Sequence, residues 1–528
     1  MAQGDPTAST LVPLATAPHT AQALPQLPSH LAAVDLGSNS FHLALARMVG
    51  RELTVVDRVQ ERVQLAAGLN DAEMLDEATQ ERALACIERF GQRLRDTPGI
   101  AVRAVGTDAL RVAKNAEAFL ERAAALLGHP IEVLSGDEEA RLIYRGVSQS
   151  LPDVVDAGGR LLVIDVGGGS TECIVGLGLE PEITTSLHMG CIGLTKAFFT
   201  DGALTRDRFR RAQIAAQLLF ERLPPRYFRP DWARAYGSSG TMMALDEVLR
   251  ANGWSPGSSG ITKDGLTKLR EAILAQGHVD RLQIPGLKPQ RVGVITAGLA
   301  IARAAFKTLP LKTLATTSAA LREGVLHDLL GRFLAHDIRE TTIDHLQARF
   351  HADAAQAARV EETALRLFSA SRWIEGKADD IERARRYLAW AARLHGIGLA
   401  ISFHGYHKHG AYILANTALP GFSRDDTQAL SVIILAHRKR IGREQFATLP
   451  RHLREMSFRL AVLLRLATRL ERSPSERAPS AVSLDVSGRI LTLRLPEGFL
   501  AAHALTQADL EEEVQRLAAA GLSLVVHS

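Results

Sequence analysis

Two places in the chain repeat one pattern of apolar and polar positions. In each, a short apolar run ends in an aspartate and a loop of very small residues, and a second apolar run follows. The two stretches are VDLGSNS at 34–40 and IDVGGGST at 164–171. The pattern predicts two β-hairpins whose first strands are buried. Because very small residues let backbone N–H groups approach an anion closely, the repeat predicts two phosphate-binding loops that hold one phosphorylated ligand from both sides.

Strand and helix patterns follow each hairpin in the same order. Short apolar runs alternate with segments in which apolar residues recur at helical spacing. The predicted strands cover 55–65, 102–105, 131–134 and 233–236, and the predicted helices cover 76–95, 109–127, 292–308 and 319–330. Strand–turn–strand units that alternate with helices, twice over, predict an α/β protein with two ribonuclease-H-like domains around a cleft. We place the limits of these domains at 31–155 and 156–330.

The patterns change at both ends of this α/β part. Residues 331–475 have apolar positions at helical spacing and no strand signal, which predicts an all-α domain. Residues 476–528 alternate apolar and polar positions and then give a helix and a last strand, which predicts a small α/β C-terminal cap. Residues 1–30 are rich in Ala, Pro, Thr and Ser and contain no Lys or Arg. A secretory signal or transit peptide does not fit this composition, so we expect a disordered tail.

Composition narrows the classes of function. At 528 residues the chain is too long for one hydrophobic core, and a net charge of +4 means that any attraction of anions must be local. We expect no nucleic-acid partner. The three cysteines, Cys86, Cys173 and Cys191, form no close pair, which argues against disulfides or a zinc site and fits a reducing cytoplasm. No apolar stretch approaches the ~18 residues of a membrane span, so no integral membrane contact is expected.

Five motifs occur in one order between residues 34 and 241. They are VDLGSNSFH (34–42), SGDEEARLIYRG (135–146), VIDVGGGSTE (163–172), HMGCIGLT (188–195) and GSSGT (237–241). Together they resemble the Ppx/GppA phosphatases, a family of exopolyphosphatases and guanosine pentaphosphate phosphohydrolases. The resemblance implies that the two α/β domains have the fold of the actin, Hsp70 and sugar-kinase superfamily. It also implies an HD-like helical domain, as in long members of the family, and a homodimer formed through that domain.

Glu139 is the candidate general base. It follows a predicted strand and lies in a Ser-Gly-Asp-Glu-Glu stretch that opens a helix. The structural alternative is that these acids only offset the positive end of the helix dipole. The resemblance implies that Glu139 orients and deprotonates the water that attacks the terminal phosphorus; Glu138 is the neighbour that could be confused with it. Phosphoryl transfer needs mainly positioning and charge neutralisation, so one carboxylate among many donors suffices.

Candidate donors to substrate phosphate lie on several loops. The two hairpin loops offer backbone and hydroxyl donors, and so does a glycine-rich loop at 237–241, where a helix N-terminus favours an anion. The resemblance adds residues 190–191 and Arg111, whose planar guanidinium suits phosphate. The alternative for Arg111 is a solvated helix residue, and Asp108 stands where family members more often have Asn, Gln or Ser. The candidate substrate-binding residues here are Asp35, Ser38, Asn39, Ser40, Arg111, Gly167, Gly168, Gly169, Ser170, Thr171, Gly190, Cys191, Ser239, Gly240 and Thr241.

Asp35, Asp165 and Glu172 are the candidate ligands of a divalent cation. Hard oxygen ligands with few protein contacts suit Mg²⁺, which keeps waters and shares phosphate oxygens. A monovalent cation such as K⁺ is left open as an additional ion. The alternative for Asp165 is that it caps its own loop by accepting hydrogen bonds from backbone N–H groups.

The predicted helical domain offers histidines and a basic stretch. HD-type phosphohydrolases need a His-Asp doublet to hold metal, and here the doublet reads His395-Gly396, so we expect no second active site. A basic stretch begins at Arg438, Lys439 and Arg440 and continues through Arg454, Arg465, Arg469 and Arg472. Such a stretch is either a solvated face or a strip that holds a long polyanion. We include Arg438, Lys439 and Arg440 among the predicted substrate-binding residues.

These observations predict a Mg²⁺-dependent exopolyphosphatase that releases terminal orthophosphate from inorganic polyphosphate by direct water attack. The nearest alternative is a guanosine pentaphosphate 5′-phosphohydrolase with the same site, and no residue separates the two. Alternatives of other classes are a nucleotide-binding sensor or sugar-kinase-like ATPase, and a polyphosphate-binding protein without hydrolysis. The sequence has no Walker A motif, no Rossmann fingerprint in a strand–helix setting and no Gly-x-Ser-x-Gly elbow.

Overall fold

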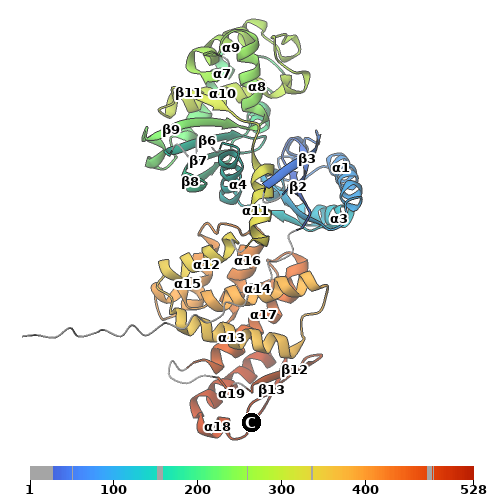
Figure 1. The fold of residues 1–528 in the computed structure, drawn as a ribbon, viewed down its shortest axis with the longest axis vertical. Coiled ribbons are helices and arrows are strands. Elements are labelled where there is room, and N and C mark those ends of the chain that lie inside the picture. Colours follow the sequence, from blue (N-terminus) through green and yellow to red (C-terminus); the bar gives the residue numbers. More distant parts are fainter. Residues whose placement is uncertain are drawn as a thin grey trace, which may run out of the picture.

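The computed structural model describes residues 28–49, 52–151, 158–257, 260–334, 337–472, 478–479 and 481–528. Figure 1 shows an elongated molecule, with the α/β part at one end and a helical part at the other. The predicted tail lies outside the described residues up to residue 27, and His30 already begins the first strand. No helix among the described residues is long and apolar enough to cross a membrane.

The first α/β unit is built on a five-stranded sheet. Its strands are β1 (His30–Leu36), β2 (Phe41–Val49), β3 (Glu52–Glu61), β4 (Ile100–Gly106) and β5 (Ile131–Val133), and its helices are α1 (Glu77–Arg95), α2 (Asp108–Val112) and α3 (Ala116–Leu127), with a 3₁₀ turn η1 (Leu65–Gly68). The strand order is β3-β2-β1-β4-β5. The first predicted hairpin is confirmed, because β1 and β2 pair antiparallel on either side of the 37–40 loop. Since β4 runs parallel to β1, both strands end at the same edge of the sheet.

The single helix predicted at 109–127 is wrong, because the structure divides it into α2 and α3. Between the two helices, the Lys114 N–H bonds to the Glu73 carbonyl at 2.9 Å. The Asn115 side chain accepts a bond from the Leu75 N–H at 2.9 Å and donates one to the Leu75 carbonyl at 3.0 Å. The first bond satisfies a backbone N–H that a continuous helix would have used, and the Asn115 bonds attach this turn to the loop before α1.

The second α/β unit has a six-stranded sheet in the order β10-β11-β9-β6-β7-β8. Its strands are β6 (Arg160–Val166), β7 (Thr171–Leu177), β8 (Glu180–Leu187), β9 (Trp232–Ser238), β10 (Ile261–Thr262) and β11 (Thr313–Thr316), and its helices are α6 (Cys191–Phe198), α7 (Arg206–Phe220), α8 (Ser239–Ala251), α9 (Lys263–Gln276) and α10 (Val292–Thr308), with 3₁₀ turns η2 (Pro225–Phe228), η3 (Val279–Arg281) and η4 (Pro289–Arg291). The second hairpin is confirmed as well, since β6 and β7 pair antiparallel around the 167–170 loop.

Two helices join the α/β units by packing out of chain order. They are α4 (Gly136–Gln149) and α11 (Leu321–Phe333). α4 follows the first sheet in the chain but packs on β7 and β8, whereas α11 ends the second unit but packs on β1 and β4. The two helices touch closely: a Cβ at Gly146 would lie 2.2 Å from the Ala320 carbonyl oxygen, and one at Gly324 would lie 1.8 Å from that of Leu142. The predicted limits at 155 and 330 follow chain order and stay a prediction.

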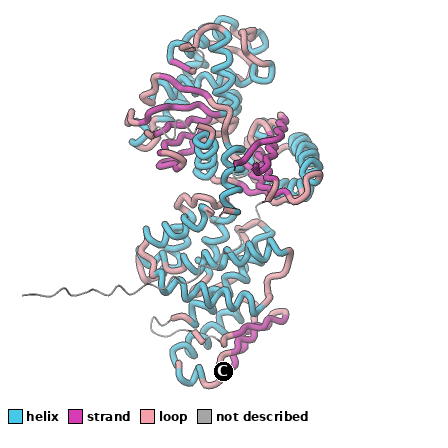
Figure 2. The backbone as a smooth tube through the Cα atoms, in the orientation of Figure 1, coloured by secondary structure: helices cyan, strands magenta, loops and turns pink. Residues whose placement is uncertain are grey.

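The remaining chain forms a helical domain and a small cap around one continuous core. The helical domain contains α12 (Ile338–Arg349), α13 (Ala354–Ser371), α14 (Ala378–Leu394), α15 (Tyr406–Ala415), α16 (Arg424–Ala436) and α17 (Arg451–Leu470), with 3₁₀ turns η5 (Ile397–Ala400) and η6 (Arg443–Phe446). The cap contains β12 (Ser483–Ser487), β13 (Ile490–Arg494), β14 (Ser523–His527), α18 (Phe499–Ala502) and α19 (Ala504–Ala519). Figure 2 shows the change from a mixed α/β part to a helical part with a short sheet at its end, so the predicted fold class is confirmed.

Candidate active site

The two hairpin loops meet at the cleft between the α/β units. A Cβ at Gly168 would lie 3.1 Å from Ser38 Cβ, so the loops are in direct contact. The N-terminus of α6 holds the second loop, because the Cys191 N–H bonds to the Gly167 carbonyl at 3.0 Å and the Ile192 N–H to that of Gly168 at 2.9 Å. The cleft between the loops has a volume of about 290 Å³.

Most of the predicted site residues line this cleft. They come from the ends of β1 and β6, the two hairpin loops, the first turn of α4 and the N-termini of α6 and α8. The predicted residues found there are Asp35, Ser38, Asn39, Ser40, Glu139, Asp165, Gly167, Gly168, Gly169, Ser170, Cys191, Ser239, Gly240 and Thr241. The fold therefore brings together the acids and the small donors that the motifs singled out.

Several predicted residues lie elsewhere. Thr171 is fully buried and donates to the Met189 carbonyl at 2.5 Å, and Glu172 is buried and accepts from Ser186 Oγ at 2.8 Å. Gly190 lies behind the second loop, where a Cβ would be 2.2 Å from the Gly168 carbonyl oxygen. Glu172 therefore does not join Asp35 and Asp165 on the cleft wall.

The basic stretch of the helical domain does not reach the cleft lining either. The Arg438 guanidinium lies over the rings of Phe403 and Tyr406, and Arg440 pairs with Glu444 at 2.6 Å. Arg465, which the spacing placed in the same stretch, is fully buried and paired with Glu513. Its inclusion in an exposed strip is thus wrong, and the role of the 438–440 segment stays a prediction.

Glu139 lies in the first turn of α4 and forms an ion pair with Arg111. Ser135 Oγ caps this helix by accepting from the Glu138 N–H at 3.2 Å. Arg111 Nη1 lies 3.1 Å from Glu139 Oε2 and donates to the Leu134 carbonyl at 2.9 Å. Burial raises the pKa of Glu139 to about 7, although Arg111 acts in the opposite direction. A carboxylate with such a pKa is suited to accept a proton near neutral pH.

Asp108 joins Arg111 of the first α/β unit to His188 of the second. Its Oδ1 accepts from Arg111 Nη2 at 3.2 Å and lies 3.3 Å from Nδ1 of His188, which precedes α6. The carboxylate also fills the space beside Gly169, where a Cβ would lie 2.1 Å from Asp108 Oδ2. Asp108 therefore forms a contact between the two α/β units.

Two arginines of the cleft wall were not among the predicted residues. Arg322, in α11, lies with Nη1 2.9 Å from His42 Nδ1, and Arg291 precedes α10 beside Gly240. Burial and Arg322 lower the pKa of His42 to about 3, so this imidazole is neutral and can accept from the guanidinium. Both arginines lie at the edges of apolar helical patterns, outside any glycine-rich motif, so no local signal distinguishes them from solvated residues.

A second cavity of about 340 Å³ adjoins the cleft and shares Arg291 with it. Arg62 and Lys288 also line this cavity. Lys288 pairs with Glu247 at 2.8 Å, whereas burial and the like charge of Arg62 lower the pKa of Arg291. Arg291 is thus a buried cation with a second guanidinium nearby, and this arrangement provides a site for a further anionic group.

Asp35 and Asp165 fit a divalent cation. Asp35 Oδ1 is buried without a hydrogen-bond partner, and burial raises the pKa of Asp35 to about 7 and that of Asp165 to about 6. Buried carboxylates of this kind gain from a cation that supplies positive charge. No group of three acidic, histidine or cysteine side chains among the described residues is arranged to hold a metal. A Mg²⁺ ion bound here would have Asp35 and Asp165 as its carboxylate ligands.

Known proteins resemble the chain over nearly its whole length. The profile of the Ppx/GppA phosphatase family matches residues 44–333, and that of Ppx/GppA phosphatase domain III matches residues 338–514. A protein of Aeromonas hydrophila named guanosine-5'-triphosphate,3'-diphosphate pyrophosphatase is 38% identical over 92% of this chain and 96% of its own. One of the same name from Pseudoalteromonas atlantica is 37% identical over 94% of this chain and 97% of its own.

A solved structure shows the same fold for the α/β part. The crystal structure of an exopolyphosphatase from Cytophaga hutchinsonii covers 57% of this chain and 98% of its own, with a TM-score of 0.52 and 23% identity. The fold defines the present chain as a protein with two α/β units and an added helical domain. Within that class, the chain belongs to the Ppx/GppA phosphatase family. The family named from the five motifs is thereby confirmed, whereas the names of the curated relatives agree with the alternative activity rather than with exopolyphosphatase.

Proposed function

We propose that this protein hydrolyses the terminal 5′ phosphoric anhydride of guanosine 3′-diphosphate 5′-triphosphate and releases orthophosphate. The observation that carries this choice over polyphosphate is the identity of 37–38%, over more than nine-tenths of the chain, to relatives named for that nucleotide. The basic cavity that adjoins the cleft supports it, because this nucleotide has two separate phosphate groups.

In the proposed reaction, the loops at 37–40 and 167–170 and the N-terminus of α8 bind the terminal phosphates through backbone and hydroxyl donors. Glu139 takes a proton from water as the water oxygen attacks the terminal phosphorus, and the bond from phosphorus to the bridging oxygen breaks. Arg291 and Arg322 stabilise the negative charge on the phosphates. Asp35 and Asp165 would hold a Mg²⁺ ion, which when bound neutralises phosphate charge.

Inorganic polyphosphate is the second candidate substrate. Neither the cleft nor the adjoining cavity has a Phe, Tyr or Trp among its described lining residues. A guanine base would therefore find no aromatic ring to stack on, whereas a chain of phosphates needs only cations and hydrogen-bond donors.

The test is orthophosphate release in the presence of Mg²⁺ from guanosine pentaphosphate, long polyphosphate, tripolyphosphate and ATP. Glu139→Gln should lower kcat by about 10² or more, because the general base is lost, while substrate binding persists. The matched control is Glu88→Gln on the exposed face of α1, which should act like the unchanged protein.

Preference for guanosine pentaphosphate would support the proposal. Preference for long polyphosphate would agree with the proposed site but would make polyphosphate the substrate. Normal turnover by Glu139→Gln would refute the role of this residue. Binding without release from any substrate would indicate a sensor built on a phosphatase fold.

A further inference from the structure

One loop of the helical domain forms hydrogen bonds with the α/β part beside the candidate active site. Residues 419–424, hereafter the 419–424 loop, precede and begin α16. The Gly421 N–H donates to Glu138 Oε2 at 3.0 Å, and the Gly421 carbonyl accepts from Arg332 Nη2 at 3.4 Å. Three residues further on, Arg424 Nη1 donates to the carbonyl oxygen of Arg111 at 3.0 Å. The helical domain thus contacts both Arg111 and the residue next to Glu139.

Hydrogen bonds within the helical domain and a close contact at Gly421 fix the conformation of the 419–424 loop. Thr342 Oγ1 donates to the Pro420 carbonyl at 2.8 Å, and Ser423 and Asp426 cap α16 reciprocally at 2.8 and 3.1 Å. Gly421 has a φ of +86°, and a Cβ there would lie 2.5 Å from Ile338 Cγ2. Only glycine fits this close, left-handed position without strain.

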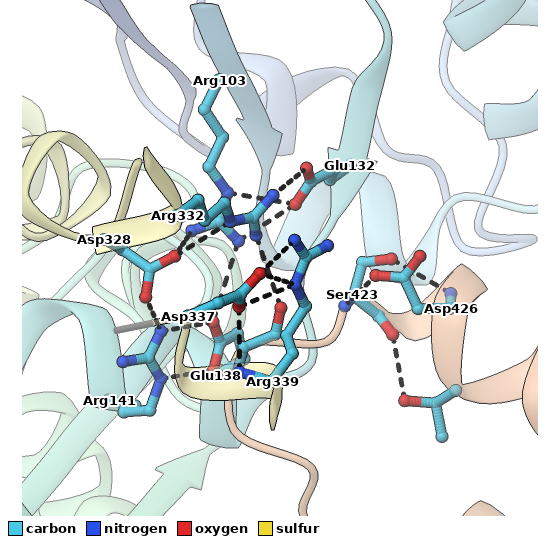
Figure 3. A network of polar contacts seen from close by, with 12 residues as sticks. Arg103, Glu132, Glu138, Arg141, Asp328, Arg332, Asp337, Arg339, Ser423 and Asp426 are labelled. Atoms are coloured by element: carbon cyan, nitrogen blue, oxygen red, sulfur yellow. Dashed lines mark hydrogen bonds and ion pairs between the residues drawn. The ribbon is translucent and has the colours of Figure 1, made fainter. Parts of the chain in front are cut away.

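Glu138 is anchored on the other side by a buried network of charges, which Figure 3 shows. Arg141 binds its carboxylate in bidentate form at 2.7 and 2.8 Å, and Asp328 bridges Arg141 and Arg103. The network joins α4, α11 and α12 to β4 and β5 of the first sheet. The charged members that Figure 3 labels are the cations Arg103, Arg141, Arg332 and Arg339 and the anions Glu132, Glu138, Asp328, Asp337 and Asp426. Because its buried charges are paired with opposite charges, the network can be both buried and rigid.

We propose that the 419–424 loop positions the Arg111–Glu139 pair for catalysis, with Arg424 acting on Arg111 and Glu138 acting on the first turn of α4. Arg424 and Glu138 are positioning residues, since neither lines the cleft. The proposal rests on the phosphatase function proposed above and assigns the helical domain a direct part in it.

A consequence for the pH dependence follows from the geometry. Arg111 favours the ionised form of Glu139, so a loosely held Arg111 leaves the pKa of Glu139 higher. Glu139 must be ionised to accept a proton, and the acid limb of the kcat profile should then move to higher pH. The other charged groups that act on Glu139 are Asp108, Asp35 and Glu172, and none of them touches the 419–424 loop.

The experiment compares the full-length protein with Arg424→Met, Arg424→Lys and the control Arg383→Met. Arg424 is exposed, so its loss should leave the fold intact. Arg383 lies in α14 and pairs with Asp380 of the same helix. Arg424→Met should lower kcat about five-fold with little change in KM and move the acid limb upward. Arg424→Lys keeps one donor and should recover part of both effects. Equal kinetics for Arg424→Met and Arg383→Met would overturn the proposal and leave the proposed function standing.

Hydrogen exchange of the amides at 107–112 and 136–141 gives a readout that needs no turnover. Faster exchange there in Arg424→Met than in Arg383→Met, at equal Tm, supports the positioning role. Unchanged exchange overturns it, even if none of the substrates is hydrolysed.

Discussion

Buried carboxylates and the cations that face them determine the chemistry of the cleft. Asp35, Asp165 and Glu139 all lie where burial raises the pKa of a carboxyl group. Asp108 differs, because burial would raise its pKa but the contacts with His188 and Arg111 outweigh this effect and lower it. Three acids of the cleft are therefore easily protonated, whereas Asp108, which contacts His188 and Arg111, stays ionised.

We predict that the contact between Asp108 and His188 depends on pH. The hydrogen bond to Asp108 raises the pKa of His188. The stabilisation that this contact provides is therefore fully present at a pH below the ordinary histidine pKa, and it is lost as the pH rises through the raised pKa. Asp108→Asn should return the pKa of His188 towards about 6.5, which NMR titration of the imidazole would measure. An unchanged titration in Asp108→Asn would show that the two groups do not interact in solution.

At the scale of elements, a contact between α6 and η1 joins the two α/β units, and we call this contact the latch. Lys196, in α6, donates from Nζ to the carbonyls of Ala66, Ala67 and Leu69 at 3.0, 2.9 and 3.0 Å. These bonds use all three donors of the ammonium group and cap the C-terminal end of η1. The two hairpin loops are thus held together by a contact outside the cleft.

Lys196→Met should weaken the closed arrangement of the units. Because Lys196 is exposed, we expect the free energy that favours the closed arrangement to fall by about 1 kcal/mol. This change corresponds to a rise in KM of about five-fold. Small-angle scattering of the free protein should show a larger radius of gyration. Lys268→Met, which removes a pair within α9, is the control. If both variants keep the KM and the scattering of the unchanged protein, the latch has no role in closure.

At the scale of the whole molecule, the buried network of Figure 3 joins the α/β part to the helical domain. Asp328 lies 2.7 Å from Arg103 and 2.5 Å from Arg141, and it is almost fully buried. Burial would raise its pKa, but the surrounding guanidinium groups keep the pKa well below its usual range.

Asp328→Asn should destabilise the protein strongly. The change leaves two buried guanidinium groups without their shared carboxylate. We expect the free energy of unfolding to fall by about 3 kcal/mol. Asp264→Asn removes an exposed pair within α9 and should cost less than about 0.5 kcal/mol. Calorimetric unfolding of both variants is the measurement, and equal midpoints would show that the network adds no stability.

Local patterns in the sequence determined the hairpins, the small-residue loops and the position of Glu139 at a helix N-terminus, because these depend on residues close together in the chain. The motifs also determined the family. Only the tertiary structure decided that α4 and α11 pack out of chain order, that Arg291 and Arg322 face the cleft and that Arg465 is buried. Each of these depends on contacts between distant segments, as the Gly421–Glu138 bond across 283 residues illustrates. Burial, which sets the pKa of the catalytic candidates, is likewise a property of the assembled cleft and of no single segment.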